Sequence, residues 1–527
     1  MSTTSTSTST GNGTATRPKA GKGESAVGSG IRWADQRLGV AKGGGKAMLD
    51  KIFPDHWSFL LGEIALYSFV VLLATGVFLS LYFDASGREI VYNGAYAPFR
   101  GVRMSAAYAS SIDLSFGVRC GLLMRQMHHW AADVFVGSMA IHMVRIFFTG
   151  AFRKPRELNW IVGVTLLTLA IVNGFLGYSL PDDLVSGTGI RIAYSIILSI
   201  PLVGTYLATL LFGGTFPGTG TIIGRFYLIH ILLVPAIIGL LVAVHLGLLV
   251  RQKHTQFPGK GRTEDNVVGS PMYPTFIAKT TGFLFMVTGI LWALGGLIQI
   301  NPIWQFGPYG GEKQFTGADI SYAVQPDWYM GWLDGALRIM PSWEFAGFGH
   351  TIPLEIFLPA VLFPGLTFGL FYAWPFLEAK LTGDRDFHNL LDRPRDKPRR
   401  TAVGAAFLAF YFMLFCASST DVLANFFHVS LNLVLWSFRF TVIVVPLIVG
   451  GMTYRICLDM SGVQGIGKRK RANIVTRSAE GAYATTVSEP RPGDGHHELD
   501  PIAVPTYIDL GDDEDPEPGV RRIARRS

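Results

Sequence analysis

The chain has 527 residues, of which 49% are hydrophobic, and its mean hydropathy is +0.34. Its apolar residues form runs that reach the roughly 20 residues a bilayer core requires, which excludes a set of soluble domains and favours a polytopic membrane protein. The net charge of +7 is interpreted as a signal of membrane orientation and not of nucleic-acid binding, because Lys and Arg collect in cytoplasmic loops.

Residues 1–47 are rich in Ser and Thr, then in Gly and Lys, without an apolar core, and we expect a disordered cytoplasmic tail. The stretch 188–212 is amphipathic and broken by proline and glycine, so it is not assigned as a crossing. Residues 459–527 are polar and are expected to form a second cytoplasmic tail. An all-α protein with eight transmembrane helices is predicted, at 58–81, 121–148, 160–180, 224–250, 279–299, 353–375, 401–419 and 430–456.

The loops after the second, fourth and sixth segments are basic, as are parts of both tails. Because the chain changes sides at every crossing, eight crossings place these three loops and both termini on the cytoplasmic side. The loops after the first, third and fifth segments then face outward.

Two of the segments carry histidines about four helical turns apart. His128 and His142 are fourteen residues apart, which is nearly four helical turns, so both imidazoles share a face roughly 21 Å apart along the axis. On the antiparallel fourth segment, His230 and His245 are fifteen apart, and a kink at Pro235 can absorb the extra residue. Pairing by depth gives an outer and an inner pair of imidazoles, the axial ligation of a six-coordinate haem.

Glycines on the first and third segments repeat the interval of fourteen, where a missing side chain leaves room for the edge of a macrocycle: Gly62 with Gly76, and Gly163 with Gly177. Three arginines flank the histidines and are placed to meet haem propionates: Arg125, Arg145 and Arg225. No Cys-x-x-Cys-His motif is present, so two non-covalent haems are expected. We therefore expect a four-helix haem-binding domain over 48–262 and a second transmembrane domain over 263–458.

Three alternatives stay open at this point. His129 is thirteen residues from His142, so spacing alone does not exclude it as the ligand in place of His128. A transporter or channel could use intramembrane histidines as proton relays, although it should then show internal repeats or broken helices near the midplane. A two-haem membrane anchor for a dehydrogenase would not need eight spans.

The outer loop after the fifth segment contains Pro326-Asp327-Trp328-Tyr329. A carboxylate among aromatic rings beside a membrane can accept a proton from a hydroquinone while the rings line an apolar pocket. By itself this short string favours the plainer interpretation of an interfacial aromatic belt with a capping aspartate.

These motifs together resemble the cytochrome b family, the haem-bearing membrane subunits of respiratory cytochrome bc complexes, over roughly 48–458. The resemblance rests on Arg125-x-x-His128 with His142, Arg225-Phe-Tyr-x-x-His230 with His245, the glycine pairs, Gly177-Tyr178-x-x-Pro181 and Pro326-Asp327-Trp328-Tyr329. The family pattern favours His128 over His129 as the ligand. It implies two b haems, a low-potential outer one and a high-potential inner one.

The resemblance also implies two quinone sites. Asp327 stands where the family has glutamate in its outer quinol-oxidising site, Tyr329 belongs to the same motif, and Gly189 matches a glycine lining that site. The residues of the family's inner quinone-reducing site match this sequence less well. His254 and Lys279 are the candidate residues for that site.

The string Arg-Gln-Met-His-His-Trp and both long tails resemble the actinobacterial form of the family. That form implies menaquinol–cytochrome c oxidoreductase activity in a bacterial cell membrane, coupled to a proton gradient. It implies a Rieske iron–sulfur subunit, a dihaem cytochrome c subunit, a dimeric complex and a supercomplex with a haem-copper cytochrome oxidase.

Overall fold

The computed structural model describes two units of the chain, Met1–Cys457 and Leu458–Ser527. In the second unit, β7 (Ala472–Arg477) and β8 (Tyr483–Ser488) form an antiparallel pair. The predicted N-terminal tail and most of the C-terminal one lie outside the described residues, which are 49–214, 216, 221–309, 325–347, 350–461, 472–477 and 483–488.

Among the described residues, eight helices are long and apolar enough to cross a membrane, which confirms the predicted number. Such segments are helical because lipid offers no hydrogen-bond partner, so each backbone amide must be satisfied within its own helix. In chain order the spans are η2–α3 (Trp57–Ser80), α5 (Gly121–Thr149), α6 (Glu157–Tyr178), α9–η4–α10 (Thr221–Gln252), η5–α11 (Met272–Leu297), α14–η8–α15 (Leu354–Thr382), α16 (Pro398–Ala417) and α18 (Leu431–Met460).

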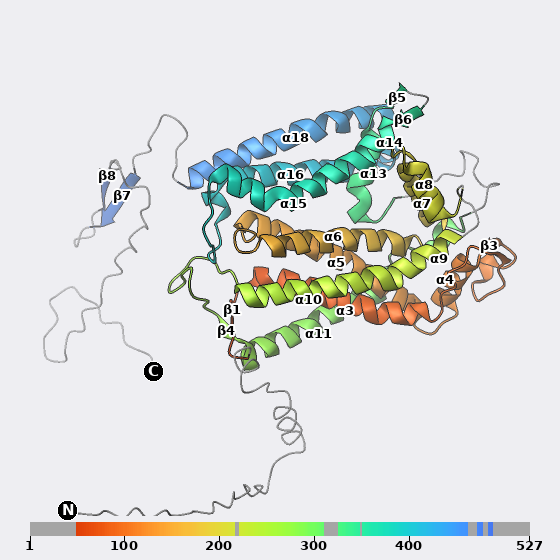
Figure 1. Ribbon diagram of the computed structural model, residues 1–527, viewed down its shortest axis with the longest axis horizontal. Helices are drawn as coiled ribbons and strands as arrows, with labels where there is room; N and C mark the ends of the chain where they lie inside the picture. The colour runs from red at the N-terminus through yellow and green to blue at the C-terminus, as the bar shows by residue number, and fades with distance from the viewer. Residues whose placement is uncertain are drawn as a thin grey trace, which may run out of the picture. The chain divides into compact units, whose positions relative to one another are not determined.

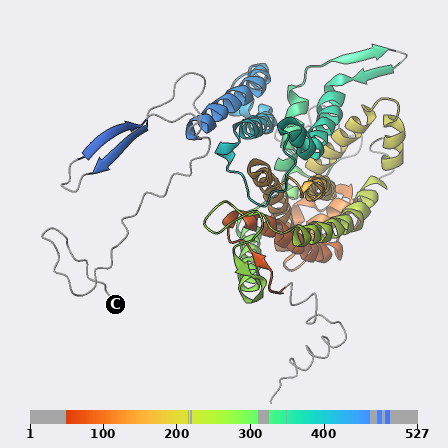
Figure 2. The ribbon, with the colours of Figure 1, turned by 60° about the vertical axis from the view of Figure 1, so that its left-hand side comes forward.

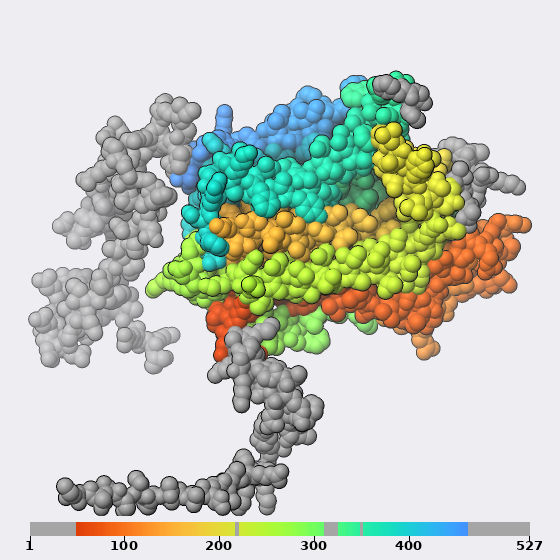
Figure 3. All heavy atoms as spheres, viewed as in Figure 1, coloured from red at the N-terminus to blue at the C-terminus, as the bar shows by residue number. Residues whose placement is uncertain are grey.

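The spans lie side by side with their axes along one common direction (Figure 1). Helices α3, α5, α6 and α10 pack together, α11 packs against α3 and α5, and α15 and α16 pack against α6 and α5. Figure 2 shows α11 and the C-terminal spans on different sides of this group. In Figure 3, α6 and α10 run next to each other along one face. The spans expose apolar side chains, and the exposed fraction is 66% for Leu240 on α10 and 71% for Leu447 on α18, which suits lipid.

Short elements occupy the ends of the spans. The stretch 188–212 forms two short helices, α7 and α8, and neither is long enough to cross, as predicted. The short helices are α4 (Ala106–Phe116), α7 (Leu184–Leu198), α8 (Gly204–Phe212), α12 (Ile303–Phe306), α13 (Gly331–Ile339) and α17 (Thr420–Phe426), and 3-10 turns lie at η3 (Ala97–Phe99), η7 (Trp328–Met330) and η9 (Pro394–Asp396). The paired strands are β1 (Ile52–Phe53) with β4 (Ser270–Pro271), β2 (Glu89–Val91) with β3 (Arg103–Ser105), and β5 (Glu344–Gly347) with β6 (His350–Pro353).

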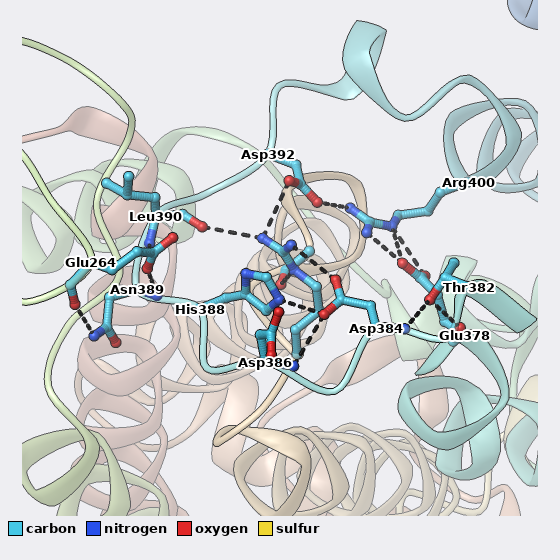
Figure 4. Close-up of polar contacts among 12 residues, drawn as sticks. Glu264, Glu378, Thr382, Asp384, Asp386, His388, Asn389, Leu390, Asp392 and Arg400 are labelled. Atoms are coloured by element: carbon cyan, nitrogen blue, oxygen red, sulfur yellow. Dashed lines mark hydrogen bonds and ion pairs between the residues drawn. The ribbon is translucent and has the colours of Figure 1, made fainter. Parts of the chain in front are cut away.

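The three basic loops, those after α5, α10 and α15, meet at one end of the bundle (Figure 4). Arg400 donates to both oxygens of Glu378 and, at 2.8 Å, to Asp392. Arg153 reaches the other oxygen of Asp392 at 3.3 Å, and Glu264 accepts from the backbone at Leu390. We call this group the loop clamp: Arg153, Glu264, Glu378, Asp384, Asp392 and Arg400. The loop clamp joins the loops after the second, fourth and sixth spans. This agrees with the prediction that the chain changes sides at every crossing, which places these three loops on the same side of the membrane.

Candidate functional site

Four histidines lie on two helices of the bundle: His128 and His142 on α5, His230 in η4 (Ile229–Leu233) and His245 in α10 (Val234–Gln252). Each ring faces one of the four glycines singled out from the sequence. A methyl group on these glycines would lie 2.5–3.6 Å from a ring carbon. The pairs are Gly76 with His128, Gly62 with His142, Gly177 with His230 and Gly163 with His245. The glycines are therefore at the predicted depths, and the neighbour that they accommodate is the imidazole itself.

The outer pair of rings has the geometry of two ligands of one metal. The ring centroids of His128 and His230 are 6.3 Å apart, with an interplanar angle of 76°. Centroids about 6 Å apart are expected when both imidazoles bond one atom between them, because a metal–nitrogen bond is about 2 Å long. His230 Nδ1 donates to the carbonyl of Asn173 at 2.9 Å, and His128 Nδ1 lies 2.8 Å from the hydroxyl oxygen of Thr75. Both rings are thus oriented through Nδ1, which leaves Nε2 for a metal.

The fifteen-residue interval is absorbed by a π-helical turn, η4, which contains His230. One π turn holds an extra residue relative to an α-helix, so a separation of fifteen brings the two histidines back to the same face. Pro235 lies two residues after the end of this turn and cannot donate a backbone hydrogen bond, which releases the carbonyl of Ile231 from its α-helical partner. The predicted role of Pro235 therefore needs the π turn beside it.

Two of the three predicted arginines have buried guanidinium nitrogens that no hydrogen bond uses among the described residues. Arg125 donates to Ser115 Oγ and to the Asn301 carbonyl, while its Nη2 has no partner among the described residues. The Arg145 guanidinium lies 4.4 Å from the ring centroid of Phe59, and its Nε and Nη2 are likewise unpaired in the described part of the chain. A buried cation with free N–H groups is costly unless an anion meets it, so these positions fit carboxylate groups of a bound cofactor.

Arg225 differs from the other two. Its side chain is exposed, and Nη1 donates to the carbonyls of Leu210 and Leu211, the latter at 2.7 Å. These carbonyls belong to the last turn of α8, where a cation is stabilising. The guanidinium is engaged as a helix cap, so its position does not support the predicted contact with a propionate.

The carboxylate of Asp327 is held between α5 and its own loop. One oxygen lies 3.0 Å from Nε2 of His129, and the other accepts from the Tyr329 hydroxyl at 2.9 Å. Asp133, one turn further along α5, brings a second carboxylate within 4.8 Å of the same group. From the sequence, His129 is predicted only as a rival haem ligand, and its partnership with Asp327 is not predicted. The spacing of four residues between His129 and Asp133 indicates that the two side chains share one face of α5, and this was the signal in the sequence for a polar site there.

Two further glycines seat the aromatic residues of this loop. A methyl group on Gly137 of α5 would lie 3.4 Å from the Trp328 ring, and one on Gly174 of α6 would lie 2.5 Å from the Tyr329 hydroxyl oxygen. Tyr329 is 3% exposed and lies in the largest core cluster, behind Asp327. The loop is therefore docked into the bundle, which contradicts the plainer interpretation of a surface aromatic belt.

Asp327 faces a pocket of about 220 Å³. Its walls come from the α6–α7 connection and from the loop after α11, including Tyr178, Asp183 and Phe306. Gly189 lies against Tyr178, so a methyl group there would be 3.2 Å from the phenol oxygen. Burial raises the pKa of the Asp183 carboxyl, whose side chain also caps α7 through the amide of Ser186. Of the predicted outer residues, Asp327 lines this cavity, Gly189 contacts Tyr178 in its wall, and Tyr329 lies behind Asp327 in the core.

The two inner candidates border the β1–β4 pair at the other end of the bundle. His254 packs against Phe53, with ring centroids 4.4 Å apart. Lys279 Nζ donates to Asp55 at 2.9 Å and to Ser270 Oγ at 3.1 Å. Since Phe53 and Ser270 are partners in the β pairing, His254 and Lys279 approach the same short ladder from two sides.

The chain is similar to many known proteins. A family model described as Cytochrome b(N-terminal)/b6/petB matches residues 133–308. The cytochrome bc1 complex cytochrome b subunit of Streptomyces coelicolor is 48% identical over 92% of this chain and 87% of its own length. Those of Mycobacterium tuberculosis and Corynebacterium diphtheriae are 50% and 51% identical, over 86% and 80% of this chain and 81% and 76% of theirs. The chain belongs to the cytochrome b family.

A solved structure titled hyperthermophilic respiratory Complex III agrees with this cytochrome b in fold. It has a TM-score of 0.57 and 20% identity, and the match covers 80% of this chain and all of the other. Membership of the cytochrome b family implies haem b as a cofactor. The paired imidazoles, the glycines beside them and the unused guanidinium N–H groups fit such a group.

Proposed function

We propose that this cytochrome b oxidises menaquinol at the pocket beside Asp327, moves electrons inward through two haems b and so contributes to a proton gradient. His128 with His230 would hold the outer haem, and His142 with His245 the inner one. The observation that carries the proposal is the matching of four imidazoles to four glycines at two depths. Bis-histidine ligation leaves no open position on the iron, which suits an electron carrier and not an oxygen-binding site.

The protein's part is to hold and orient the cofactors. When bound, the haems supply one-electron transfer across the membrane. Arg125 and Arg145 would bind the carboxylates of the haems. Arg125 brings buried N–H donors to the depth of the outer histidine pair, and Arg145 brings them to the depth of the inner pair. Thr75 and Asn173 fix the outer rings through Nδ1, so neither imidazole can turn its bonding nitrogen away.

At the outer site, Asp327 is the proton acceptor. Each carboxylate oxygen has two lone pairs, and the bonds to His129 and Tyr329 use one on each oxygen. The remaining lone pairs can accept the hydroxyl proton of a quinol bound in the adjoining pocket. His129 and Tyr329 act as positioning residues that keep the carboxylate fixed while the quinol is oxidised.

Quinol oxidation releases two electrons, and the proposal sends them along different routes. One goes to a Rieske iron–sulfur subunit and a dihaem cytochrome c subunit, and the other crosses the bilayer to an inner quinone near His254 and Lys279. The relatives are named as subunits of cytochrome bc1 complexes, which supports partners of this kind. We further propose a dimeric complex and a supercomplex with a haem-copper oxidase. The end of the bundle where the loop clamp lies would face the cytoplasm, and we propose that both termini are cytoplasmic as well.

The test is a dithionite-reduced minus oxidised spectrum of the purified complex, with haem extraction and quantitation. We expect two non-covalent b haems per chain. His128→Ala and His142→Ala should each remove a different one, because each deletes one axial ligand. The matched control is His129→Ala, which should retain both haems. Folded protein without haem would overturn the proposal in favour of a histidine proton relay.

A further inference from the structure

Glu63 places a half-buried carboxyl group in the first turn of α3, at the depth of the inner histidine pair. It follows Gly62, whose Cα faces the ring of His142, and one helical step along α3 (Leu60–Ser80) is only about 1.5 Å. The carboxyl accepts from the Thr280 hydroxyl at 2.9 Å and from the Tyr67 hydroxyl at 3.2 Å. No cation of the described residues forms an ion pair with it. Ionisable groups within membrane spans commonly mark proton pathways.

Polar groups continue from Glu63 toward the inner end of α11 (Ile277–Leu297). The hydroxyls of Tyr67 and Thr280 contact each other, and Tyr67 also donates to the Thr280 carbonyl at 3.1 Å. The residue before Thr280 is Lys279, whose ammonium group joins Asp55 and Ser270 at the β1–β4 pair. Hydroxyl contacts therefore join Glu63 to Tyr67 and Thr280. The group formed by Lys279, Asp55 and Ser270 lies one residue before Thr280 along the chain, and we call all of these polar groups the line.

The surroundings of this line are apolar. Further along the same interface, α3 and α11 pack through Val71, Val287 and Leu291, with Ile64 and Phe283 at its edge. The titratable and charged groups at the inner ends of the elements that pack around Glu63 are Tyr67 on α3, Lys279 on α11, and His142 and Arg145 on α5. Lys279 is engaged by Asp55, and Arg145 lies against Phe59, so neither neutralises the carboxyl.

We propose that Glu63 delivers protons from the inner side to a quinone bound beside the inner histidine pair. This inference rests on the proposed function, which supplies the electrons. Reduction of a quinone to a hydroquinone takes two electrons and two protons. For each proton, the O–H bond of the Glu63 carboxyl breaks and an O–H bond forms on a quinone oxygen. The carboxylate then regains a proton from the inner aqueous phase through the hydroxyls of Thr280 and Tyr67, with Asp55 and Lys279 at the entrance.

The experiment uses the purified, haem-loaded complex and compares Glu63→Gln with Glu157→Gln. Glutamine keeps the acceptor oxygen for Thr280 and Tyr67 but cannot release a proton at neutral pH. Glu157 lies at the start of α6, in the first turn of that helix, and has no place in the line, so it is the matched control. The measurements are haem content, the rate at which a water-soluble menaquinone analogue reoxidises the prereduced inner haem, and the pH dependence of that haem's midpoint potential.

We expect Glu63→Gln to retain both haems, to slow reoxidation on the order of 100-fold, and to flatten the pH dependence of the potential. Glu63→Asp should restore part of the rate, because a carboxyl remains one methylene short of Thr280. A Glu63→Gln complex with the rate and the pH dependence of the control would overturn the inference. Wild-type protein that folds without haem would instead overturn the proposed function, so the two failures are distinguishable.

A second pair of variants covers the case in which Glu63→Gln loses its haem. Thr280→Val and Tyr67→Phe each remove one hydroxyl of the line and leave the carboxyl in place. Each of these single variants should slow reoxidation of the inner haem less than Glu63→Gln does. The double variant should slow it more than either single variant. Reoxidation at the wild-type rate in the double variant would overturn the inference.

Discussion

At some glycines of this protein, one added methyl group would collide with a neighbouring side chain. The clearest case is Gly177, where a methyl group would lie 2.5 Å from a carbon of the His230 ring. Real side chains essentially never approach so closely, so the ring or helix α6 must move. The ring is held by Asn173 on the same helix, which limits how far it can shift.

We predict that Gly177→Ala lowers the content of the outer haem while the inner one stays. The added methyl group displaces His230, and a displaced imidazole cannot complete bis-histidine ligation. Haem quantitation and the reduced spectrum measure this directly. Gly247→Ala on α10 is the control, since nothing lies within 4 Å of the added methyl group there. Equal haem content in the two variants would contradict the prediction.

His254 gives a pH-dependent prediction. Its pKa is lowered to about 4 by burial first and then by the charges of Lys51 and Arg156. The unfolded chain therefore binds a proton on this residue at a higher pH than the folded chain does. The contribution of neutral His254 to the free energy of unfolding is fully present above a pH of about 6.5. It is lost as the pH falls toward 4, and the loss is about 3 kcal/mol at most.

Thermal unfolding of the complex in detergent, followed from pH 7.5 to 4.5, measures this effect. His254→Gln should show a smaller fall in melting temperature over that range than the wild type does. His428→Asn changes an exposed histidine and should follow the wild-type curve. Parallel curves for wild type and His254→Gln would count against a buried neutral imidazole.

At the scale of helices, the sequence predicts the spans well because hydropathy and length are local properties. The first span was predicted over 58–81 and lies at Trp57–Ser80. The sixth was predicted to end at 375 and continues to Thr382, because its last turns carry charged residues that hydropathy does not assign to a membrane. The glycine and histidine intervals were readable for the same reason, since a periodic face is a local property of a helix.

Contacts between distant segments could not be read in this way. The bond from His129 to Asp327 joins residues 198 positions apart, and that from Glu63 to Thr280 joins residues 217 apart. Neither residue pair has a spacing that marks it in the sequence, because only packing of the helices brings the partners together. The π turn at His230 is similarly hidden, since its sequence is as apolar as the α-helix around it.

The loop clamp gives a prediction at the scale of the elements it joins. Arg400 is buried and binds Glu378 and Asp392 together. Arg400→Leu leaves two carboxylates without their shared cation, which should cost about 3 kcal/mol of unfolding free energy. The neighbouring Arg399→Leu removes an exposed charge and should change stability by less than about 0.5 kcal/mol. Equal melting temperatures for the two variants would exclude the clamp as a stabilising element.

At the scale of the whole molecule, haems held at the two histidine pairs, as proposed, would set the direction of charge movement. They lie roughly 21 Å apart along α5, a large part of the bilayer core. Moving an electron inward against an existing membrane potential costs about 2.3 kcal/mol per 100 mV for a full crossing. The proposed arrangement therefore stores energy only if the inner site binds the electron more tightly than the outer one. A proton supplied by Glu63 would contribute to that tighter binding.

The glycines beside the imidazoles also bear on speed. A ring that touches helix backbone on one side, and is hydrogen-bonded through Nδ1 as in the outer pair, has little freedom to turn when the charge between the rings changes. Little rearrangement of the surroundings is then needed for an electron to arrive or leave. Each of the proposed electron transfers would then require only a small thermal fluctuation, so the absence of four side chains would help to make the proposed crossing fast.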